Sequence, residues 1–383
     1  MKIVVVVPYL TRVGGAARYA WELSEYLASK KDQVLVVSLY ADRNMYDSKL
    51  NLKVVDLADE SNLTQTVKFW ITLRKISKKL ADLIILEKPD IVLFNHFPCT
   101  LWAKKYGNIP IIAYPQDVNF LYTNTYINNL SIGKRFLWQI LRLFIRPYDK
   151  KKWKCFDHVI CNSNFSAKNI SQSYAINPLV IYPGTNIQKF KPSNIRSKKR
   201  SILTMGDARN RQADFLIKAA GMLYKKRNDF KIWVVGANRK QEEELEKLVQ
   251  KYDLTTIVEF FGKVSDSKLA ELYSQSLVTT HLIKEAPFGL IAIEAMACGT
   301  PVIALKPSGT EETIVDGETG FLINENHYED LIGCMEKFLD DPKLSLTMGQ
   351  KASIRVQNYF EMNKQYEELR DFMQKCINEK ITS

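Results

Sequence analysis

One stretch of the C-terminal half, residues 284–322, combines residue types that suit an anionic ligand. KEAPFGLIAIEAMACG places a Pro-Phe-Gly turn directly before a run of helix-forming residues, so we expect a helix to begin near Gly289. The free amides and positive dipole end at a helix start attract phosphate. Glu294 lies more than a turn inside this helix, where its carboxylate could accept hydrogen bonds from two ribose hydroxyls. The alternative is an ordinary helix-strand unit with surface glutamates.

The rest of the chain alternates between apolar runs and helical patterns. In the N-terminal half the apolar runs are residues 3–7, 33–39, 91–94, 109–113 and 158–161. In the C-terminal half they are SILTMG, FKIWVVG, IVEFFG, LVTTHL, PVIAL and GFLI. This alternation predicts parallel sheets that are covered by helices on both faces. Because 383 residues are too many for one ordinary core, we expect two Rossmann-like α/β domains and a terminal helix at 358–378.

The positive charge of the chain is confined to its N-terminal half. The net charge is +12, but residues 1–200 hold 31 Lys and Arg against 14 Asp and Glu, whereas residues 201–383 hold 23 against 28. Such a field suits nucleic acid, an anionic membrane surface or a phosphate-bearing acceptor. Residues 133–154 and 68–80 combine large apolar residues with lysines and arginines. They are interpreted either as core-facing helices with solvated basic faces or as attachment sites for an anionic leaflet.

Several other classes of protein are disfavoured. No apolar run reaches the roughly 18 residues of a membrane-spanning helix, and MKIVVVVPYL is interpreted as a first strand rather than a signal peptide. The six cysteines show no metal-ligand spacing, which suits a reducing cytosol. The basic stretches lack a nucleic-acid module, so we expect no nucleic-acid partner.

The string FGLIAIEAMACGTPVIA, followed by GTEETIVDGETGFL, closely resembles the C-terminal signature of the retaining GT-B glycosyltransferases of glycosyltransferase family 4. ICNSNFS (160–166) and VIYPGTNIQKFKP (180–192) resemble the segments before and within the family's interdomain linker. The resemblance implies an α/β GT-B fold with two Rossmann-like, doubly wound domains that face a central cleft. The domains would comprise residues 1–190, with the helix at about 358–383 crossing back, and residues 191–357.

The resemblance also assigns individual residues. EFFGKVSDSKLAELYSQS (259–276) is similar to the family's strand, loop and helix beside the nucleotide base. The residues assigned to the donor nucleotide are Gly262, Lys263, Phe288, Gly289, Leu290 and Glu294. In the first domain, the turn with Gly14 and Gly15 corresponds to a place that the family uses near the acceptor and the sugar. A tight strand-to-helix turn is the alternative for this glycine pair.

The chain departs from the family pattern at three places. Asp207 and Gln212 stand where the family has a basic pair that binds the diphosphate of the donor. We therefore assign the binding of the diphosphate to Arg209 and Arg211, whose guanidinium forks suit it. The alternative is two exposed loop arginines. The family's sugar-binding Glu falls on Ala286, with Glu285 one residue too early. We expect Glu285 to take that role; otherwise it is a solvated charge.

The third departure is Gln116, which stands where the family often has a His that contacts the sugar. Its amide still donates and accepts hydrogen bonds but cannot act as an imidazole acid. His96 and Asp117 are further candidates for contacts to the acceptor or sugar, although a lone His at a strand end is more often structural.

The expected function is therefore retaining transfer of a hexosyl unit from a UDP- or GDP-sugar to a lipid-linked or glycan acceptor, in cell-surface polysaccharide or glycoconjugate synthesis. Neither a metal nor another cofactor is expected, and the resemblance implies that the leaving phosphate helps to deprotonate the acceptor. The expected location is the cytoplasm, at the inner face of the cell membrane. The alternatives are a catalytically weak nucleotide-sugar- or glycan-binding protein and, less favoured, a GT-B epimerase or phosphorylase.

Overall fold

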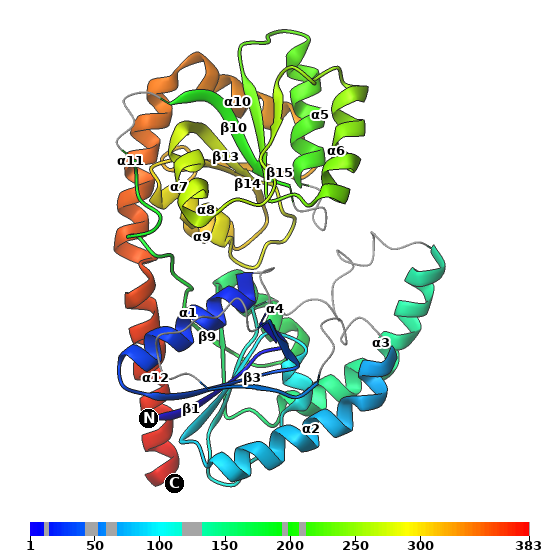
Figure 1. Cartoon of the computed structure of the whole chain (residues 1–383), viewed down its shortest axis with the longest axis vertical. Coiled ribbons are helices and arrows are strands. Elements are labelled where there is room, and N and C mark those ends of the chain that lie inside the picture. The colour runs from blue at the N-terminus through cyan, green and yellow to red at the C-terminus, as the bar shows by residue number, and fades with distance from the viewer. Residues whose placement is uncertain are drawn as a thin grey trace. The chain divides into compact units, whose positions relative to one another are not determined.

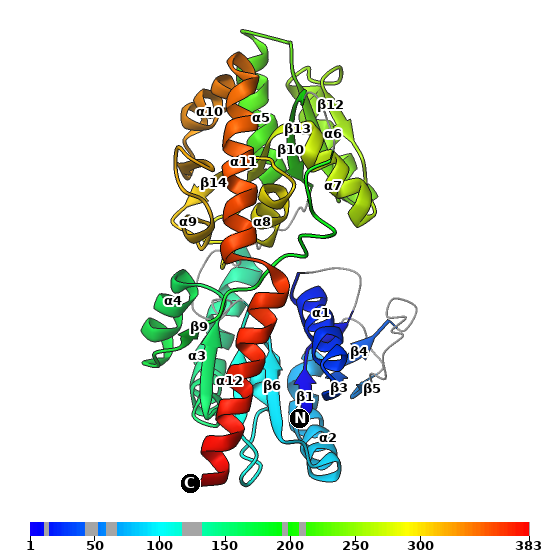
Figure 2. The ribbon, with the colours of Figure 1, turned by 90° about the vertical axis from the view of Figure 1, so that its left-hand side faces the viewer.

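The computed structural model describes residues 1–10, 15–42, 53–58, 67–116, 132–193, 198–206 and 212–382. The chain forms two compact units (Figures 1 and 2). The first consists of Met1–Pro183 with Asn363–Ser383, and the second of Gly184–Met362. None of the helices among the described residues is long and apolar enough to cross a membrane.

A parallel sheet of seven strands forms the centre of the first unit, in the order β5-β3-β1-β6-β7-β8-β9. Its strands are β1 (Lys2–Val6), β3 (Gln33–Ser38), β5 (Lys53–Asp56), β6 (Ile91–Asn95), β7 (Ile111–Tyr114), β8 (His158–Cys161) and β9 (Leu179–Val180). A separate pair is formed by β2 (Tyr9–Leu10) and β4 (Tyr40–Ala41). The five predicted apolar runs are all strands, and they are buried because helices cover both faces of the sheet.

The helices of the first unit are α1 (Gly15–Ser29), α2 (Val67–Glu87), a 3-10 turn (Cys99–Trp102), α3 (Ile132–Trp153), α4 (Asn164–Tyr174) and α12 (Met362–Thr382). Although α12 ends the chain, it packs on this first unit, as the resemblance implied. Its Arg370 binds Asp32 with an Nε to carboxylate distance of 2.8 Å. Its Tyr366 also meets Tyr19 of α1 edge to face at 5.5 Å between ring centres.

The second unit contains a parallel sheet of six strands in the order β12-β11-β10-β13-β14-β15. They are β10 (Lys199–Met205), β11 (Lys231–Val235), β12 (Val258–Phe260), β13 (Ser276–His281), β14 (Val302–Lys306) and β15 (Gly320–Asn324), which confirms the six predicted strands. The helices are α5 (Gln212–Tyr224), α6 (Arg239–Lys251), α7 (Asp266–Gln275), α8 (Leu290–Ala297), α9 (Thr310–Thr313), α10 (Tyr328–Asp340) and α11 (Pro342–Tyr359).

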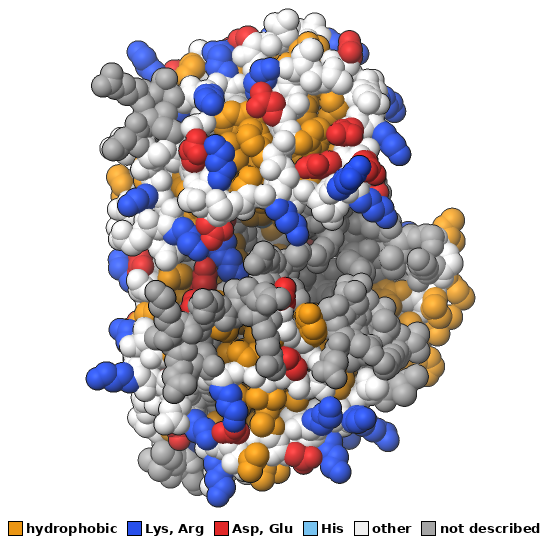
Figure 3. Space-filling view, in the orientation of Figure 1, with side chains coloured by type: hydrophobic (Ala, Val, Ile, Leu, Met, Phe, Trp, Pro, Cys, Tyr) orange, Lys and Arg blue, Asp and Glu red, His pale blue; other side chains and the backbone are white. Residues whose placement is uncertain are grey.

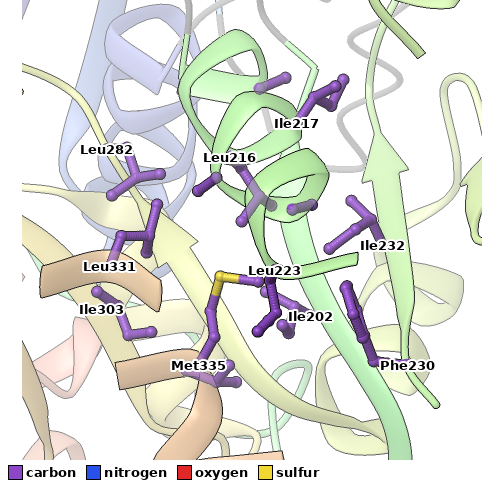
Figure 4. Packing of buried hydrophobic residues seen from close by; sticks show 14 of the residues in the cluster. Ile202, Leu216, Ile217, Leu223, Phe230, Ile232, Leu282, Ile303, Leu331 and Met335 are labelled. Atoms are coloured by element: carbon purple, nitrogen blue, oxygen red, sulfur yellow. The ribbon is translucent and has the colours of Figure 1, made fainter. Parts of the chain in front are cut away.

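The core of the second unit lies where α5 and α10 cover the sheet (Figure 4). Leu216 and Leu223 of α5 are fully buried, and they belong to the same cluster as Ile202 of β10 and Met335 of α10. Removal of this apolar surface from water is the main favourable contribution to folding. The cluster packs α5 and α10 against the strands, and the loops at the carboxyl ends of those strands follow from this packed layer.

Both sheets follow the Rossmann strand order. Counted along the chain, without the β2-β4 pair, the order is 3-2-1-4-5-6 in each sheet, with β9 as a seventh strand in the first. The order therefore reverses between β1 and β6 and between β10 and β13. In open α/β sheets, ligands bind outside the carboxyl ends of the strands at such a reversal. The loops that follow β6 and β13 therefore lie where ligands of such sheets bind.

Candidate functional site

The start of α8 is the part of the second unit that the sequence predicts to bind a phosphate. The helix begins at Leu290, as predicted, and Gly289 is its N-cap residue with φ 101° and ψ 65°. This left-handed conformation is one that side chains rarely adopt. Among the described residues no side chain caps the helix, and uncapped amides at a helix start can bind an anion.

The turn before α9 packs tightly against the loop that leads into α8. The Gly309 amide donates a hydrogen bond to the carbonyl of Ala286 at 2.7 Å. A Cβ atom at Gly309 would lie 2.0 Å from the carbonyl oxygen of Pro287, so only glycine fits there. The carboxylate of Glu311 accepts a hydrogen bond from the Ser308 amide at 2.9 Å, which fixes the same turn. These contacts hold the approach to α8 in one conformation.

His281 is a member of this region that sequence reasoning missed. It ends β13 at the reversal of strand order, and it is only 2% exposed. Neither ring nitrogen has a hydrogen-bond partner among the described residues. A Cβ atom at Gly289 would lie 3.2 Å from Nε2, so the imidazole packs directly beneath the start of α8. Burial lowers the pKa of His281 to about 4, and the ring is therefore neutral at neutral pH.

Glu294 and Phe288 flank the helix start. Glu294 lies in α8 and is 6% exposed, an unusual degree of burial for a carboxylate. Phe288 is buried and packs edge to face on Phe360 at 5.6 Å between ring centres. The side chain of Phe288 thus contributes to the core of the unit, and its predicted contact with the nucleotide would come from its backbone.

The segment before Pro287 contains Glu285, the residue for which the resemblance predicts a contact with the sugar. Glu285 is half-buried and has φ 50°, a left-handed conformation that is uncommon for a residue with a side chain. Ala286 is buried. Lys284 forms an ion pair with Glu325 at 2.8 Å. The role of Glu285 in binding the sugar stays a prediction.

The loop after β12 contains the other two predicted nucleotide residues. Gly262 has φ 55°, and its carbonyl accepts a hydrogen bond from the Gly236 amide, which follows β11, at 2.6 Å. The side chain of Lys263 is exposed. The Gly206 amide, after β10, donates to the carbonyl of Val235 at 2.7 Å. These bonds bring the loops after three neighbouring strands to one edge of the sheet. Arg209 and Arg211 lie outside the described residues.

Gln116 lies in a hydrogen-bond network at the carboxyl edge of the first sheet. Its Nε2 donates to Oδ1 of Asn95, which ends β6, at 3.1 Å. Asn162, which follows β8, donates from Nδ2 to the Gln116 carbonyl at 3.0 Å. Asn95 in turn donates from Nδ2 to the carbonyl of Ala16 in α1 at 3.3 Å. Asn95 and Asn162 are buried and were not identified from the sequence. Each directly follows or ends an apolar run, which is the signal that could have found them.

The structure brings Gly15, His96 and Gln116 to the same edge of the first sheet. Gly15 is exposed at the first position of α1. His96 is half-buried with φ 78°, and its amide donates to the carbonyl of Tyr114 at 3.1 Å. Gly14 and Asp117 lie outside the described residues. Within the part of the chain that the structure describes, no group of three His, Cys, Asp or Glu side chains could hold a metal ion.

The two α/β units, each with the Rossmann strand order, have the GT-B fold, as solved structures of similar fold show. Sucrose-phosphate synthase of Thermosynechococcus elongatus shares this fold with a TM-score of 0.81 and 21% identity, over 98% of this chain and 99% of that one. HepE of Anabaena, solved with UDP-glucose, gives a TM-score of 0.76 and 16% identity over 98% of this chain and 100% of its own.

The family follows from the sequence comparisons. The model for Glycosyltransferase Family 4 matches residues 13–189 and that for Glycosyl transferases group 1 matches residues 186–355. The chain belongs to this glycosyltransferase family. The D-inositol 3-phosphate glycosyltransferase of Streptomyces avermitilis is 28% identical over 219 residues, which cover 51% of this chain and 47% of that relative. The chain thus spans about half the length of the first curated relatives that it matches.

Proposed function

We propose that the protein is a retaining glycosyltransferase that moves a hexosyl unit from a UDP- or GDP-sugar to a lipid-linked or glycan acceptor. Its product would be part of a cell-surface polysaccharide or glycoconjugate. The observation that carries the proposal is the uncapped start of α8 at a left-handed Gly289, with a buried carboxylate, Glu294, in the same helix. The family and the UDP-glucose bound by HepE support a nucleotide-sugar donor.

The proposed chemistry assigns the diphosphate to the start of α8. In the reaction, the bond between the acceptor oxygen and the sugar C1 forms on the face that the leaving phosphate vacates, and the acceptor proton passes to a phosphate oxygen. Amides aimed at the developing negative charge would supply the largest stabilisation. The resemblance adds Arg209 and Arg211 as cations for the same charge, and neither a metal nor another cofactor is required.

The remaining residues would hold the sugar and the nucleoside. Glu294 would accept hydrogen bonds from the ribose hydroxyls, and the loops with Gly262 and Lys263 would contact the base. Glu285 would bind sugar hydroxyls from its left-handed position. Gln116 would offer its amide to the sugar, with Gly15 and His96 at the same edge for the acceptor. We place this activity in the cytoplasm, at the inner face of the cell membrane, because the basic N-terminal half suits an anionic surface.

Substitution of Glu294 tests the proposal. Glu294→Ala would leave the ribose hydroxyls unpaired and weaken donor binding by about 1–3 kcal/mol, or roughly 5- to 150-fold. Release of free UDP and GDP across common sugar nucleotides would identify the donor, and titration with that nucleotide would measure the loss. Glu246→Ala, which removes an exposed carboxylate in the middle of α6, is the matched control. Unchanged donor affinity in a folded Glu294→Ala protein would overturn the ribose assignment.

A second candidate function is a nucleotide-sugar- or glycan-binding protein with little or no catalysis. Two features favour it: the buried Ala286 stands where the resemblance implies a Glu, and Gln116 stands where the family often has a His. Hydrolysis of the donor without acceptor separates the two candidates, because a binding protein would retain the nucleotide sugar intact.

A further inference from the structure

Helix α3 exposes an apolar face that nothing among the described residues covers. Six of the thirteen exposed large hydrophobic side chains of the described chain lie on this helix, with exposures from 39% to 89%. They are Ile132, Phe136, Leu137, Ile140, Leu143 and Phe144. At about 100° per residue, the six positions fall within an arc of roughly 140°. Figure 3 shows hydrophobic side chains along the edge of the molecule that α3 forms.

The opposite face of α3 attaches the helix to the first unit. Ile145, Asp149 and Trp153 are buried. Asp149 accepts hydrogen bonds from Nε1 of Trp153 at 3.2 Å and from the hydroxyl of Tyr174 in α4 at 2.6 Å. Asp149 is the single acidic residue of α3, and its burial leaves the exposed surface of the helix without negative charge. These contacts attach the second half of the helix, from Ile145 to Trp153, to the first unit.

Cations border the apolar face along one side. Arg135, Arg146 and Lys150 fall within an arc of about 60° that adjoins the apolar arc. Arg146 and Lys150 also line a groove of about 590 Å³ between α3 and α4, together with Leu143, Pro147, Gln172 and Ser173. None of these lining residues is acidic. The groove thus offers two cations and two neutral hydrogen-bonding side chains beside an apolar surface.

This combination fits the boundary between headgroups and acyl chains of a bilayer. A helix with an apolar face and flanking Lys and Arg lies in that plane with its apolar side chains inserted by about 5–10 Å. By contrast, Leu73, Ile76 and Leu80, the large apolar side chains described for the similar pattern at residues 68–80, are buried in α2. Among the described side chains of these two basic amphipathic segments, the large exposed apolar ones lie on α3.

We propose that α3 lies in the surface of an anionic bilayer and that the groove at Arg146 and Lys150 binds the phosphate of an anionic lipid headgroup. Phe136, Leu143 and Phe144 enter the acyl boundary, and the two cations take the phosphate at its rim. The biological purpose of this surface rests on the proposed function, because a lipid-linked acceptor must be reached at a membrane. Vesicle binding itself requires no glycosyl transfer.

Sedimentation of the full chain with vesicles tests this proposal. We expect binding to vesicles rich in phosphatidylglycerol, little binding to phosphatidylcholine alone, and weakening by salt. Arg146→Gln with Lys150→Gln should reduce the affinity about 30-fold at low salt, or about fivefold per cation. Phe136→Ser with Phe144→Ser should reduce it at least about tenfold. Lys240→Gln with Lys247→Gln, on the exposed side of α6, removes the same charge and should change little.

The outcomes separate the possible occupants. Absence of vesicle binding at low salt, or equal losses in the α6 control, would overturn the proposal. Self-association of the free chain that disappears in Phe136→Ser/Phe144→Ser would assign this face to a second copy instead. Nucleotide affinity of each variant, measured in parallel, should equal that of the unchanged chain. A variant that no longer binds vesicles but still binds nucleotide supports the membrane surface independently of the donor site. A chain that binds vesicles but no sugar nucleotide contradicts only the proposed function.

Discussion

Replacement of Gly289 by alanine should impair both the stability of the second unit and the binding of the donor. Gly289 is the N-cap of α8 with φ 101°, and its backbone lies close to Thr310 of α9 and to the His281 ring. A methyl group at this position would meet Cγ2 of Thr310 at 2.7 Å and Nε2 of His281 at 3.2 Å. The backbone or these two neighbours must move, and the amides at the start of α8 move with them.

The magnitude follows from two separate costs. The left-handed conformation destabilises a residue with a side chain by about 1–2 kcal/mol. Over-packing of a well-filled site adds roughly 1–3 kcal/mol, because Thr310 is buried in the adjoining turn. The free energy of unfolding should therefore fall by about 2–5 kcal/mol. An anion at a helix start gains up to ~2 kcal/mol, so displaced amides should weaken nucleotide binding by as much as about 30-fold.

Gly317→Ala provides the matched control. Gly317 has φ 77°, but a Cβ atom there would meet nothing within 4 Å. The Gly317→Ala variant should therefore lose only the conformational contribution, about 1–2 kcal/mol of stability, and should bind nucleotide as the unchanged chain does. Urea unfolding of both variants measures stability, and titration with UDP and GDP measures binding. Equal losses of stability in the two variants, together with unchanged nucleotide affinity in Gly289→Ala, would refute the assignment of the anion to the start of α8.

Two further predictions concern residues beside the same loop. Because burial lowers the pKa of His281 to about 4 from 6.5, the unfolded chain binds this proton more readily. Stability should fall as pH falls from about 6.5 to about 4, by up to ~3 kcal/mol from this group. His281→Leu should flatten that part of a pH series of urea unfolding, and an unaltered slope would contradict the burial argument. Arg355 donates from Nε to the carbonyl of Thr313 and from Nη2 to that of Glu312, both at 2.8 Å. Arg355→Lys keeps the charge but cannot make both bonds, so we expect a loss of about 1–3 kcal/mol and a higher donor KM; unchanged stability and KM would argue against a positioning role.

Much of the fold was predictable because parallel strands buried on both faces appear in the sequence as continuous apolar runs. Runs such as IVVVV and KIWVV show this directly, and the start of α8 was marked by its Pro-Phe-Gly turn. Short strands such as β9, with two residues, carry too little pattern to be recognised. The exposed face of α3 could not be predicted either. Its periodicity is the same whether the apolar side packs inward or outward, and only the tertiary fold decides between them.

The candidate site was predictable only where one continuous segment forms it. Gly289 and Glu294 lie on one turn and one helix, so their spacing was informative. The contact of His281 with Gly289 joins a strand end to a helix start, and the bonds of Gln116 join residues up to 46 positions apart. Such contacts exist only after the sheets have formed. The sequence TTHL around His281 indicates only the end of a strand, and nothing in it predicts the contact with Gly289.

The two sheets differ in the chemistry that they present at equivalent points. Each fourth strand, β6 and β13, ends at or just before a histidine, but the surroundings differ. His96 adjoins a network of amide side chains from Asn95, Gln116 and Asn162, all of them neutral. His281 lies under an uncapped helix start and is held neutral by burial.

Neutral amides suit hydroxyl-rich ligands, because they both donate and accept hydrogen bonds. Because the His281 ring beneath the start of α8 is uncharged, the positive dipole end of the helix can attract an anion. This division supports the proposal that the second unit takes the diphosphate. The resemblance implies a His at the position of Gln116, and we propose that the Gln116 amide can still bind a sugar hydroxyl, because the proposed proton acceptor is the leaving phosphate and not a side chain.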